Sequence, residues 1–595
     1  MLKKIFFSTT IFLVFSFCSS KASGNWQTWY EAHDKNSTPR YDETIAFSKR
    51  LADASPMLHY TSFGQSHQLR DLPLLILDKD GLFTPEAAHE SEKVVLMVMA
   101  AIHPGEPAGK DAGLKLLRDI VIHGEHKDLL ENVTLLFIPI FNVDGHERFG
   151  PYNRINQNGP EKMGWRTNAL NLNLNRDFLK ADTKEMQHFI QLWDHWQPDF
   201  FIDTHSTNGA DYQYTMTYLL EIFGNMEENL SDWCENEFLP FWEKRMKEDG
   251  YPVFPYVTYR RWHDPRSGLR SRVAPPALST GYATQRNRPG LLLETHMLKP
   301  YHKRVESTYL NLVHTMEFLN RENYSLKTLV AAADEKTAST MFRSMPFPLD
   351  FEATSDSVMV KFKGVEYQIK ESSLSGGDWF IYESDKPVTY EIPWFNQQEA
   401  TAEIMLPEAY IIPVQWEEVI ESLALHGIIM HRLAQDKQVK VESYRFEEVS
   451  LSGSVNEGRQ TASFQSIPIT ETRSYPAGSV VIPMNQKTAR IIAHALEPKA
   501  PSSFAYWGFF NSIFQRTEYF ESYVMETIAR EMIKEDPSLK EKLEIRLQQD
   551  EDLASNPRAI LNWFYEQTPY VDQKHNVYPV GKIMDSLTLQ KLMEQ

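Results

Sequence analysis

Apolar and polar positions between residues 25 and 335 follow a pattern in which strand-like and helix-like stretches alternate. Four continuous apolar runs have the length expected of strands that are buried on both faces of a sheet. They occupy 94–101, 133–140, 199–204 and 290–294. Amphipathic stretches that predict helices lie at about 107–122, 183–196, 226–249 and 302–320. This alternation predicts an α/β fold with a mixed, mainly parallel sheet flanked by helices.

The pattern changes after a bland stretch at 331–340. Segments such as 357–370 and 388–392 read as short strands joined by turns, which predicts a β-rich accessory region at 341–480. Apolar-aromatic clusters and charged residues then predict a helical C-terminal region at 481–595. No repeat of 20 to 50 residues is evident, so a solenoid or propeller is not expected.

The amino terminus has the pattern of a secretory signal peptide. Two lysines precede the apolar run 5–17, and small residues follow it up to Gly24. The run is too short to span a bilayer as a stable helix. We therefore expect residues 1–24 to be removed, leaving a secreted or periplasmic protein without a transmembrane segment.

Cys18 within this segment raises the alternative of a lipid anchor. Bulky Phe15 and Phe17 stand where small or aliphatic residues are expected before a lipidated cysteine, so we do not expect lipid attachment. Cleavage beyond Cys18 would leave Cys234 as the only cysteine. No intrachain disulfide is then expected.

Charge excludes several partner classes. The chain has 61 basic and 80 acidic residues, a formal net charge of -19, and we find no basic run. Such a chain repels nucleic acids and anionic lipid surfaces. We therefore expect a peptide or small amide substrate and no nucleic acid partner.

Two predicted strands end in histidine. His103 and Glu106 follow the first apolar run at a spacing of three, where a strand passes into a helix, and His205 closes the third run. Each feature alone is more often a capping or strand-end residue than a metal ligand. Together they predict His₂Glu ligation of one Zn²⁺ with an open position for water.

An acidic residue closes the fourth run. Glu294 follows three leucines, where burial would raise its pKa. A zinc hydrolase needs a carboxylate beside the metal to take a proton from water and deliver it to the leaving amine. Glu294 is therefore the candidate general base, although a strand-end carboxylate facing solvent is an equally good reading of this run alone.

A stretch rich in asparagine lies between the two ligand pairs. It contains Trp165-Arg166 and Asn173-Leu-Asn175-Arg176. An arginine fork beside an asparagine suits a substrate carboxylate, because bidentate charge-assisted hydrogen bonds fix its orientation. Without the metal candidates, this stretch would read as a loop that satisfies its own turns.

In this order, the motifs resemble the carboxypeptidase A-like zinc metallopeptidases over about residues 40–320. The resemblance implies that His103, Glu106 and His205 bind zinc, and that Glu294 activates water. It further implies that Arg166 stabilises the oxyanion and that Asn175 and Arg176 hold the terminal carboxylate of the substrate. On this basis we expect a secreted zinc metallocarboxypeptidase.

The family also has a tyrosine that closes over the substrate, on a loop before the catalytic glutamate. Tyr282 is the nearest candidate in this sequence and Tyr259 the second. Tyr282 lies closer to Glu294 than the family pattern has it. This departure leaves the loop geometry and the side-chain specificity open.

Two other functions fit parts of the pattern. A zinc amidohydrolase of the aspartoacylase and succinylglutamate desuccinylase type would use similar zinc residues on a small acylated amino acid. A non-catalytic peptide-binding protein could retain the fold, although intact candidates for every ligand and for the base argue against it. The aromatic cluster between Phe504 and Phe514 reads as core, with a border of the zinc cleft as the alternative.

Overall fold

Eight strands form one mixed sheet in the computed structural model, which describes residues 25–207 and 209–594. The strand order is β1-β2-β4-β3-β5-β9-β6-β7. The strands are β1 Leu58–Gln65, β2 Asp71–Leu77, β3 Val94–Met99, β4 Val133–Ile138, β5 Phe200–Thr207, β6 Met216–Leu220, β7 Val253–Pro255 and β9 Gly290–His296. The central strands β4, β3, β5 and β9 run parallel, with antiparallel pairs on both sides. The predicted fold class is confirmed, whereas the signal segment with Cys18 lies outside the described residues.

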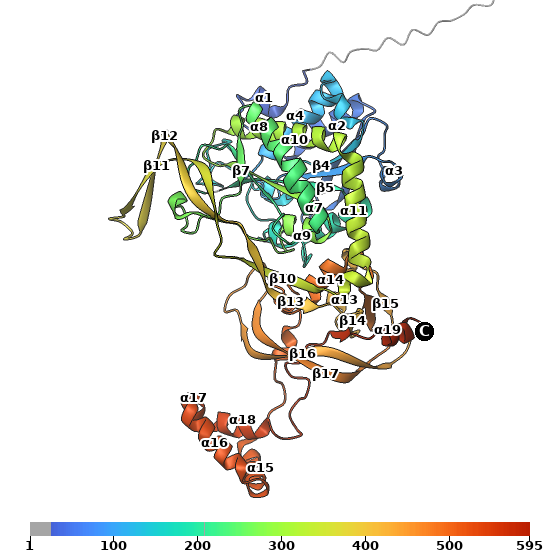
Figure 1. The fold of residues 1–595 in the computed structure, drawn as a ribbon, viewed down its shortest axis with the longest axis vertical. Helices are drawn as coiled ribbons and strands as arrows, with labels where there is room; N and C mark the ends of the chain where they lie inside the picture. The colour runs from blue at the N-terminus through green and yellow to red at the C-terminus, as the bar shows by residue number, and fades with distance from the viewer. Residues whose placement is uncertain (1–24, 208, 595) are drawn as a thin grey trace, which may run out of the picture.

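Helices cover both faces of this sheet (Figure 1). They are α1 Trp29–Ala32, α2 Tyr41–Ala54, α3 Pro85–Glu90, α4 Ala108–Arg118, α5 Val143–Glu147, α6 Lys184–Trp196, α7 Glu228–Trp233, α8 Leu239–Glu248, α9 Ser279–Gln285, α10 Tyr301–Arg321 and α11 Asn323–Ala338. Along β3, Leu96 and Val98 join one apolar cluster, while Met97 and Met99 join another. Because successive side chains of a strand point to opposite faces, both faces of β3 are packed against helices.

The β-rich part consists of three sheets. A two-stranded sheet pairs β10 Pro346–Ala353 with β13 Gln398–Met405, and a long hairpin pairs β11 Val358–Glu371 with β12 Asp378–Phe395. Strand β12 also pairs with β8 Leu269–Arg270. The six-stranded sheet contains β14 Ala409–Ile412, β15 His431–Arg432, β16 Lys437–Leu451, β17 Ala462–Tyr475, β18 Val480–Pro483 and β19 Gly581–Ile583. Beside it lie α12 Thr340–Arg343, α13 Glu417–Leu425, α14 Ala489–Leu496 and α19 Ser586–Met593.

One apolar core joins the α/β part to the six-stranded sheet. Phe189 and Trp193 of α6 belong to the same buried cluster as Tyr410 of β14 and Ile492 of α14. Burying apolar surface is the main driving force of folding. The two parts therefore stabilise each other rather than standing as separate globules.

A helical module stands apart from this core. Helices α15 Ser522–Glu535, α16 Ser538–Gln549, α17 Glu551–Ser555 and α18 Pro557–Tyr565 share a small apolar cluster of their own. Figure 1 shows them beyond the six-stranded sheet, at the end opposite the eight-stranded sheet. Arg516 before the module forms an ion pair with Glu566 after it, at 3.0 Å. The chain therefore enters and leaves the module at one place.

No helix within the described ranges combines the length and the apolar character needed to cross a membrane.

Candidate metal site and substrate cleft

The candidate ligands meet where parallel strands end. His103 follows β3, Glu106 precedes α4, and His205 lies near the end of β5. Strands β3 and β5 are neighbours, with Met99 opposite Asp203. Because the carboxyl ends of parallel strands share one edge of the sheet, the pairing brings the two histidines together.

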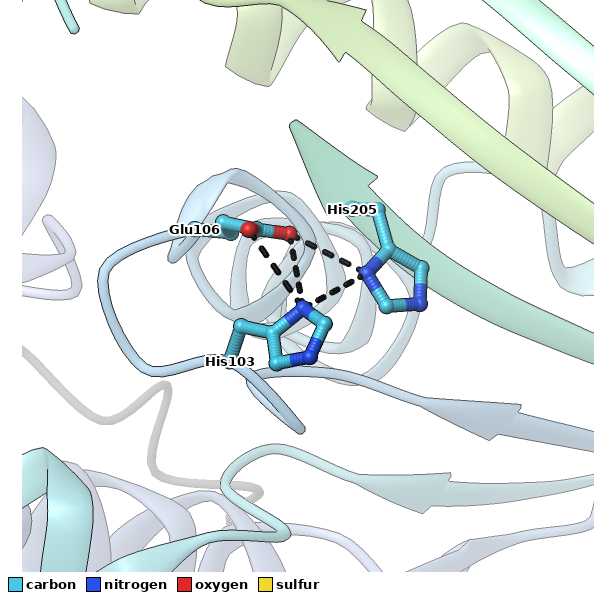
Figure 2. Close-up of side chains that lie close together, drawn as sticks. All are labelled: His103, Glu106 and His205. Carbon is cyan, nitrogen blue, oxygen red and sulfur yellow. Dashed lines mark hydrogen bonds and ion pairs between the residues drawn. The ribbon is translucent and has the colours of Figure 1, made fainter. Parts of the chain in front are cut away.

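Figure 2 shows the three side chains pointing at one another. The two histidine Nδ1 atoms are 3.1 Å apart. Glu106 Oε2 lies 3.1 Å from the Nδ1 of His205 and 3.4 Å from that of His103. All three side chains are buried. Among the residues that the structure describes, they form the cluster of His, Cys, Asp and Glu side chains that is close enough together to hold a metal ion.

The outer nitrogen of each ring is already engaged. His103 Nε2 donates to Asn173 Oδ1 at 2.9 Å, and His205 Nε2 donates to Asp203 Oδ2 at 2.7 Å. With both protons on Nε2, the two Nδ1 lone pairs face each other and a carboxylate oxygen. Three acceptors converging without a proton are unfavourable unless a cation lies between them. Two imidazole nitrogens and one carboxylate oxygen also form a typical donor set of catalytic zinc sites.

The two histidines differ in protonation. Burial would lower the pKa of His205, but Asp203 and Glu106 raise it well above its usual value, so its ring holds a second proton unless a cation takes the place of that proton. Burial lowers the pKa of His103 to about 4, which keeps its ring neutral. Burial would raise the pKa of Glu106, but Arg154 and His103 hold it well below its usual range. Arg154 Nη1 contacts Glu106 Oε1 at 2.5 Å. One carboxylate oxygen therefore pairs with Arg154, and the other faces the histidines.

Glu294 lies beside this group, because β9 is the next strand in the sheet. His205 and Glu294 are directly opposite in the β5–β9 pairing. Glu294 Oε2 is buried and has no hydrogen-bond partner among the described residues. Burial raises the pKa of Glu294 to about 8. A carboxyl group with this pKa can accept and return a proton near neutral pH.

The predicted substrate residues line the same cleft, which has a volume of about 1470 Å³. Arg166 points at the metal group, with Nη1 3.4 Å from Glu106 Oε1, and its side chain is 45% exposed. Asn175 is buried, and its Oδ1 accepts from Ser279 N at 3.0 Å. Arg176 is partly buried, and Nη1 donates to the carbonyl of Asn175. All three polar side chains are brought together with the candidate ligands and Glu294.

The two candidate closing tyrosines are placed differently. Tyr282 on α9 is fully buried in the core, donates or accepts a hydrogen bond with His426 Nδ1 at 3.0 Å, and does not line the cleft. Tyr259 lines the cleft but is 4% exposed and packs into a neighbouring apolar cluster. Tyr256, just after β7, lines the cleft and is partly exposed. Burial raises its pKa, and the charges of Glu294, Glu106 and Arg166 also act on its hydroxyl.

The β-rich part contributes to the cleft through Trp394 of β12, which lines it. Its indole Nε1 donates to Ser271 Oγ at 2.9 Å. The aromatic cluster between Phe504 and Phe514 does not line the cleft, and most of its rings belong to the main core. This aromatic cluster is therefore part of the core and does not border the zinc cleft.

Three residues around the site are absent from the sequence-based predictions. Arg154 comes from the irregular loop between α5 and α6, where no periodicity marks a residue for the site. Glu457 Oε2 accepts from the backbone nitrogen of Asn173 at 2.8 Å, across 284 positions of sequence. Asp203 could have been found, because it shares a strand face with His205 two residues later.

Comparisons with known proteins agree with this geometry. The family model described as zinc carboxypeptidase matches residues 44–219, a span that contains His103, Glu106 and His205 but ends before Glu294. Carboxypeptidase 2 of Trichophyton rubrum is 24% identical over 493 residues, covering 80% of this chain and 85% of that protein. Carboxypeptidase 2 of Trichophyton equinum is 24% identical over 495 residues, with the same coverage.

Solved structures are similar over about half of the chain. A metallo-carboxypeptidase from Burkholderia cenocepacia is 17% identical with a TM-score of 0.35, covering 47% of this chain and 69% of that one. A metallo-carboxypeptidase from Pseudomonas aeruginosa is 17% identical with a TM-score of 0.36, covering 48% and 69%. The family model matches across the metal candidates, and curated carboxypeptidases are relatives of this chain. The resemblance predicted from the sequence is therefore confirmed over residues 44–219, and the chain is a zinc metallopeptidase of the carboxypeptidase type.

Proposed function

We propose that this protein is a secreted metallocarboxypeptidase that hydrolyses the peptide bond near a free C-terminal carboxylate. The observation that carries the proposal is the convergence of two Nδ1 lone pairs and a Glu106 oxygen beside Glu294, inside a cleft that also holds arginine and asparagine side chains. His103, Glu106 and His205 would hold one zinc ion per chain. When bound, zinc would supply Lewis-acid polarisation of the scissile carbonyl and of the attacking water.

Glu294 has the role of general base and later of general acid. Its buried, unpartnered oxygen and its raised pKa support proton uptake from water and delivery to the leaving amine. Arg166 reaches toward the metal group from the loop between α5 and α6 and would stabilise the negative charge that develops on the carbonyl oxygen.

Asn175 and Arg176 would bind the terminal carboxylate, since a guanidinium and an amide offer several donors to two oxygens. Tyr256 is our candidate for the tyrosine that closes over the substrate, in place of Tyr282. Its support is its place on the cleft wall among the charges of Glu294, Glu106 and Arg166.

We also propose that residues 1–24 are a cleaved signal peptide and that 25–335 is the catalytic domain. The region 341–480 would complete the cleft wall, as Trp394 suggests, and 481–595 would complete the core. Sequencing the amino terminus of the exported protein tests the signal peptide, and a mature chain that begins at Met1 would contradict it.

The catalytic proposal is tested with one peptide prepared with a free and with an amidated carboxy terminus. We expect rapid release of the last residue from the free peptide, and a strongly lower kcat/KM with a higher KM for the amide. Removing zinc with a chelator should abolish both rates, and adding zinc should restore them. Equal rates on the two peptides would instead indicate an endopeptidase or amidase.

A further inference from the structure

One wall of the cleft carries positive charge that the described chain does not neutralise. Arg260, Arg270 and Arg272 line the cleft and are exposed. Each lacks a carboxylate within ion-pair distance among the described residues. By contrast, Arg261, which does not line the cleft, pairs with Asp378. Three uncompensated guanidinium groups in one cleft wall make a site for an anion.

Strand pairing places these side chains on the same surface. Tyr259 and Leu269 are directly opposite each other in an antiparallel bridge. Arg260 N donates to Gly268 O at 3.0 Å, and Arg270 N donates to Thr258 O at 2.8 Å. Since side chains alternate along a strand, Arg260 and Arg270 share the face opposite to that of the buried Tyr259–Leu269 pair. Arg272 follows Arg270 by two residues and extends the row.

The row is held firmly by strand β12. Leu269 and Arg270 pair with Trp394 and Phe395, and Ser271 N donates to Phe395 O at 3.0 Å. The guanidinium of Arg260 lies over the ring of Phe395, 4.5 Å from its centroid. A cation stacked on an aromatic ring keeps its N–H edge free for a carboxylate. The β-rich part thus presents the positive row to the cleft.

Charge within the cleft is opposite to that of the whole chain. The chain is acidic, with a net charge of -19. The cleft is nevertheless lined by six arginines and four glutamates, with no lysine or aspartate. Two of those glutamates, Glu106 and Glu294, belong to the metal group and its base. Because the surrounding surface repels acidic ligands, this local reversal selects where an acidic segment can bind.

We infer that the row formed by Arg260, Arg270 and Arg272 is a binding subsite for acidic side chains, so that the enzyme prefers peptides with glutamate or aspartate close to the cleaved bond. This inference rests on the proposed function, because it assigns the substrate class of the same cleft. Arginine binds carboxylates in a bidentate manner, which gives direction as well as charge. Salt should weaken the preference, because the side chains are exposed.

The parent substrate of the test is the tetrapeptide Ala-Ala-Ala-Phe, with a blocked amino terminus and a free carboxy terminus. Glutamate, glutamine or lysine replaces each of the four positions in turn, and kcat/KM is measured for every peptide. At one or more positions, glutamate should exceed glutamine by about tenfold, as expected for one or two partly exposed ion pairs. Lysine at that position should give the lowest value.

Variants locate the preference. The triple variant R260Q/R270Q/R272Q should bring the glutamate-to-glutamine ratio close to one, whereas R261Q is the matched control and should keep the ratio of the wild type. Equal kcat/KM for glutamate and glutamine at all four positions would overturn the subsite while leaving the carboxypeptidase assignment intact. A preference that survives in R260Q/R270Q/R272Q would also overturn it. Failure of the proposed function is recognised separately, by lack of hydrolysis of every free peptide.

Discussion

Replacing Glu294 by glutamine tests the proposed mechanism at one atom. The two side chains have the same shape, and the exchange removes a charge and a proton acceptor while replacing one oxygen by an NH₂ donor. Because Oε2 has no hydrogen-bond partner among the described residues, the variant breaks no hydrogen bond at that atom. The fold and the three metal ligands should therefore remain in place.

The expected loss follows from the role of the group. General acid and base catalysis contributes about 10²- to 10⁴-fold to a rate, which corresponds to roughly 3 to 5 kcal/mol in the barrier. We expect kcat to fall by about that factor in Glu294→Gln. Zinc content, measured by metal analysis of the purified variant, should stay at the wild-type level, because Glu294 is not one of the converging ligands.

The assay is release of the C-terminal residue from a free tetrapeptide, followed over several hours so that a 10⁴-fold slower rate is still measured. Glu235→Gln is the matched control, because Glu235 also lines the cleft but lies outside the metal group. A kcat within about tenfold of the wild type in Glu294→Gln, with zinc bound, would remove Glu294 from the mechanism.

Four further outcomes are expected. His205→Ala should lose stoichiometric zinc, and full occupancy by metal analysis would refute its assignment as a ligand. Tyr256→Phe should lower kcat/KM by about tenfold, which corresponds to the loss of one hydrogen bond. Tyr282→Phe should keep kcat and lower the free energy of unfolding, measured by urea denaturation, by about 1 kcal/mol. The reverse pattern would make Tyr282 the substrate-closing residue. Ile492→Ala should lower the free energy of unfolding by about 2 to 5 kcal/mol, and it should shift one common unfolding transition, because the cluster around Ile492 includes residues of α6. A separate, unshifted transition of the α/β part would contradict a shared core. Burial raises the pKa of Glu221 to about 8, so between about pH 4.5 and 8 the folded protein retains a proton that the unfolded chain releases, and stability falls as pH rises through this range. Glu221→Gln should remove that fall in stability. Equal pH profiles of the melting temperature for the wild type and the variant would show that Glu221 is not buried as described.

The site residues that the apolar pattern itself indicated are those at the ends of buried strands, whereas Arg166, Asn175 and Arg176 were assigned their roles through the family resemblance. His103, His205 and Glu294 each close an apolar run, and a run of this kind marks both the strand and its end. The predicted strands agree with β3, β4, β5 and β9 to within three residues at each end. The predicted helix at 226–249 is α7 and α8 joined by a π-helical turn, which no local pattern indicated.

Residues that depend on long-range packing could not be predicted. Tyr282 was a candidate because of its nearness to Glu294 in sequence, but α9 turns it toward Phe178 and Trp193 in the core. Glu457 accepts a hydrogen bond from the Asn173 backbone and lies in a turn of the β-rich part. Nothing in the sequence around either residue indicates that the two are in contact. Such contacts depend on how elements that are distant in sequence pack against each other. The periodicity of a single segment carries no information about this packing.

The helical module made of α15 to α18 has a consequence for how this chain can vary. Its two ends are tied together by Arg516 and Glu566, and its apolar cluster is its own. A segment that leaves and returns at one point is, for the rest of the protein, a closed loop, and the entropic cost of a loop grows only slowly with its length. The module is thus an insertion that can lengthen, shorten or be exchanged for another domain while the catalytic sheet keeps its shape, which makes it the natural position for a tether or a fused reporter.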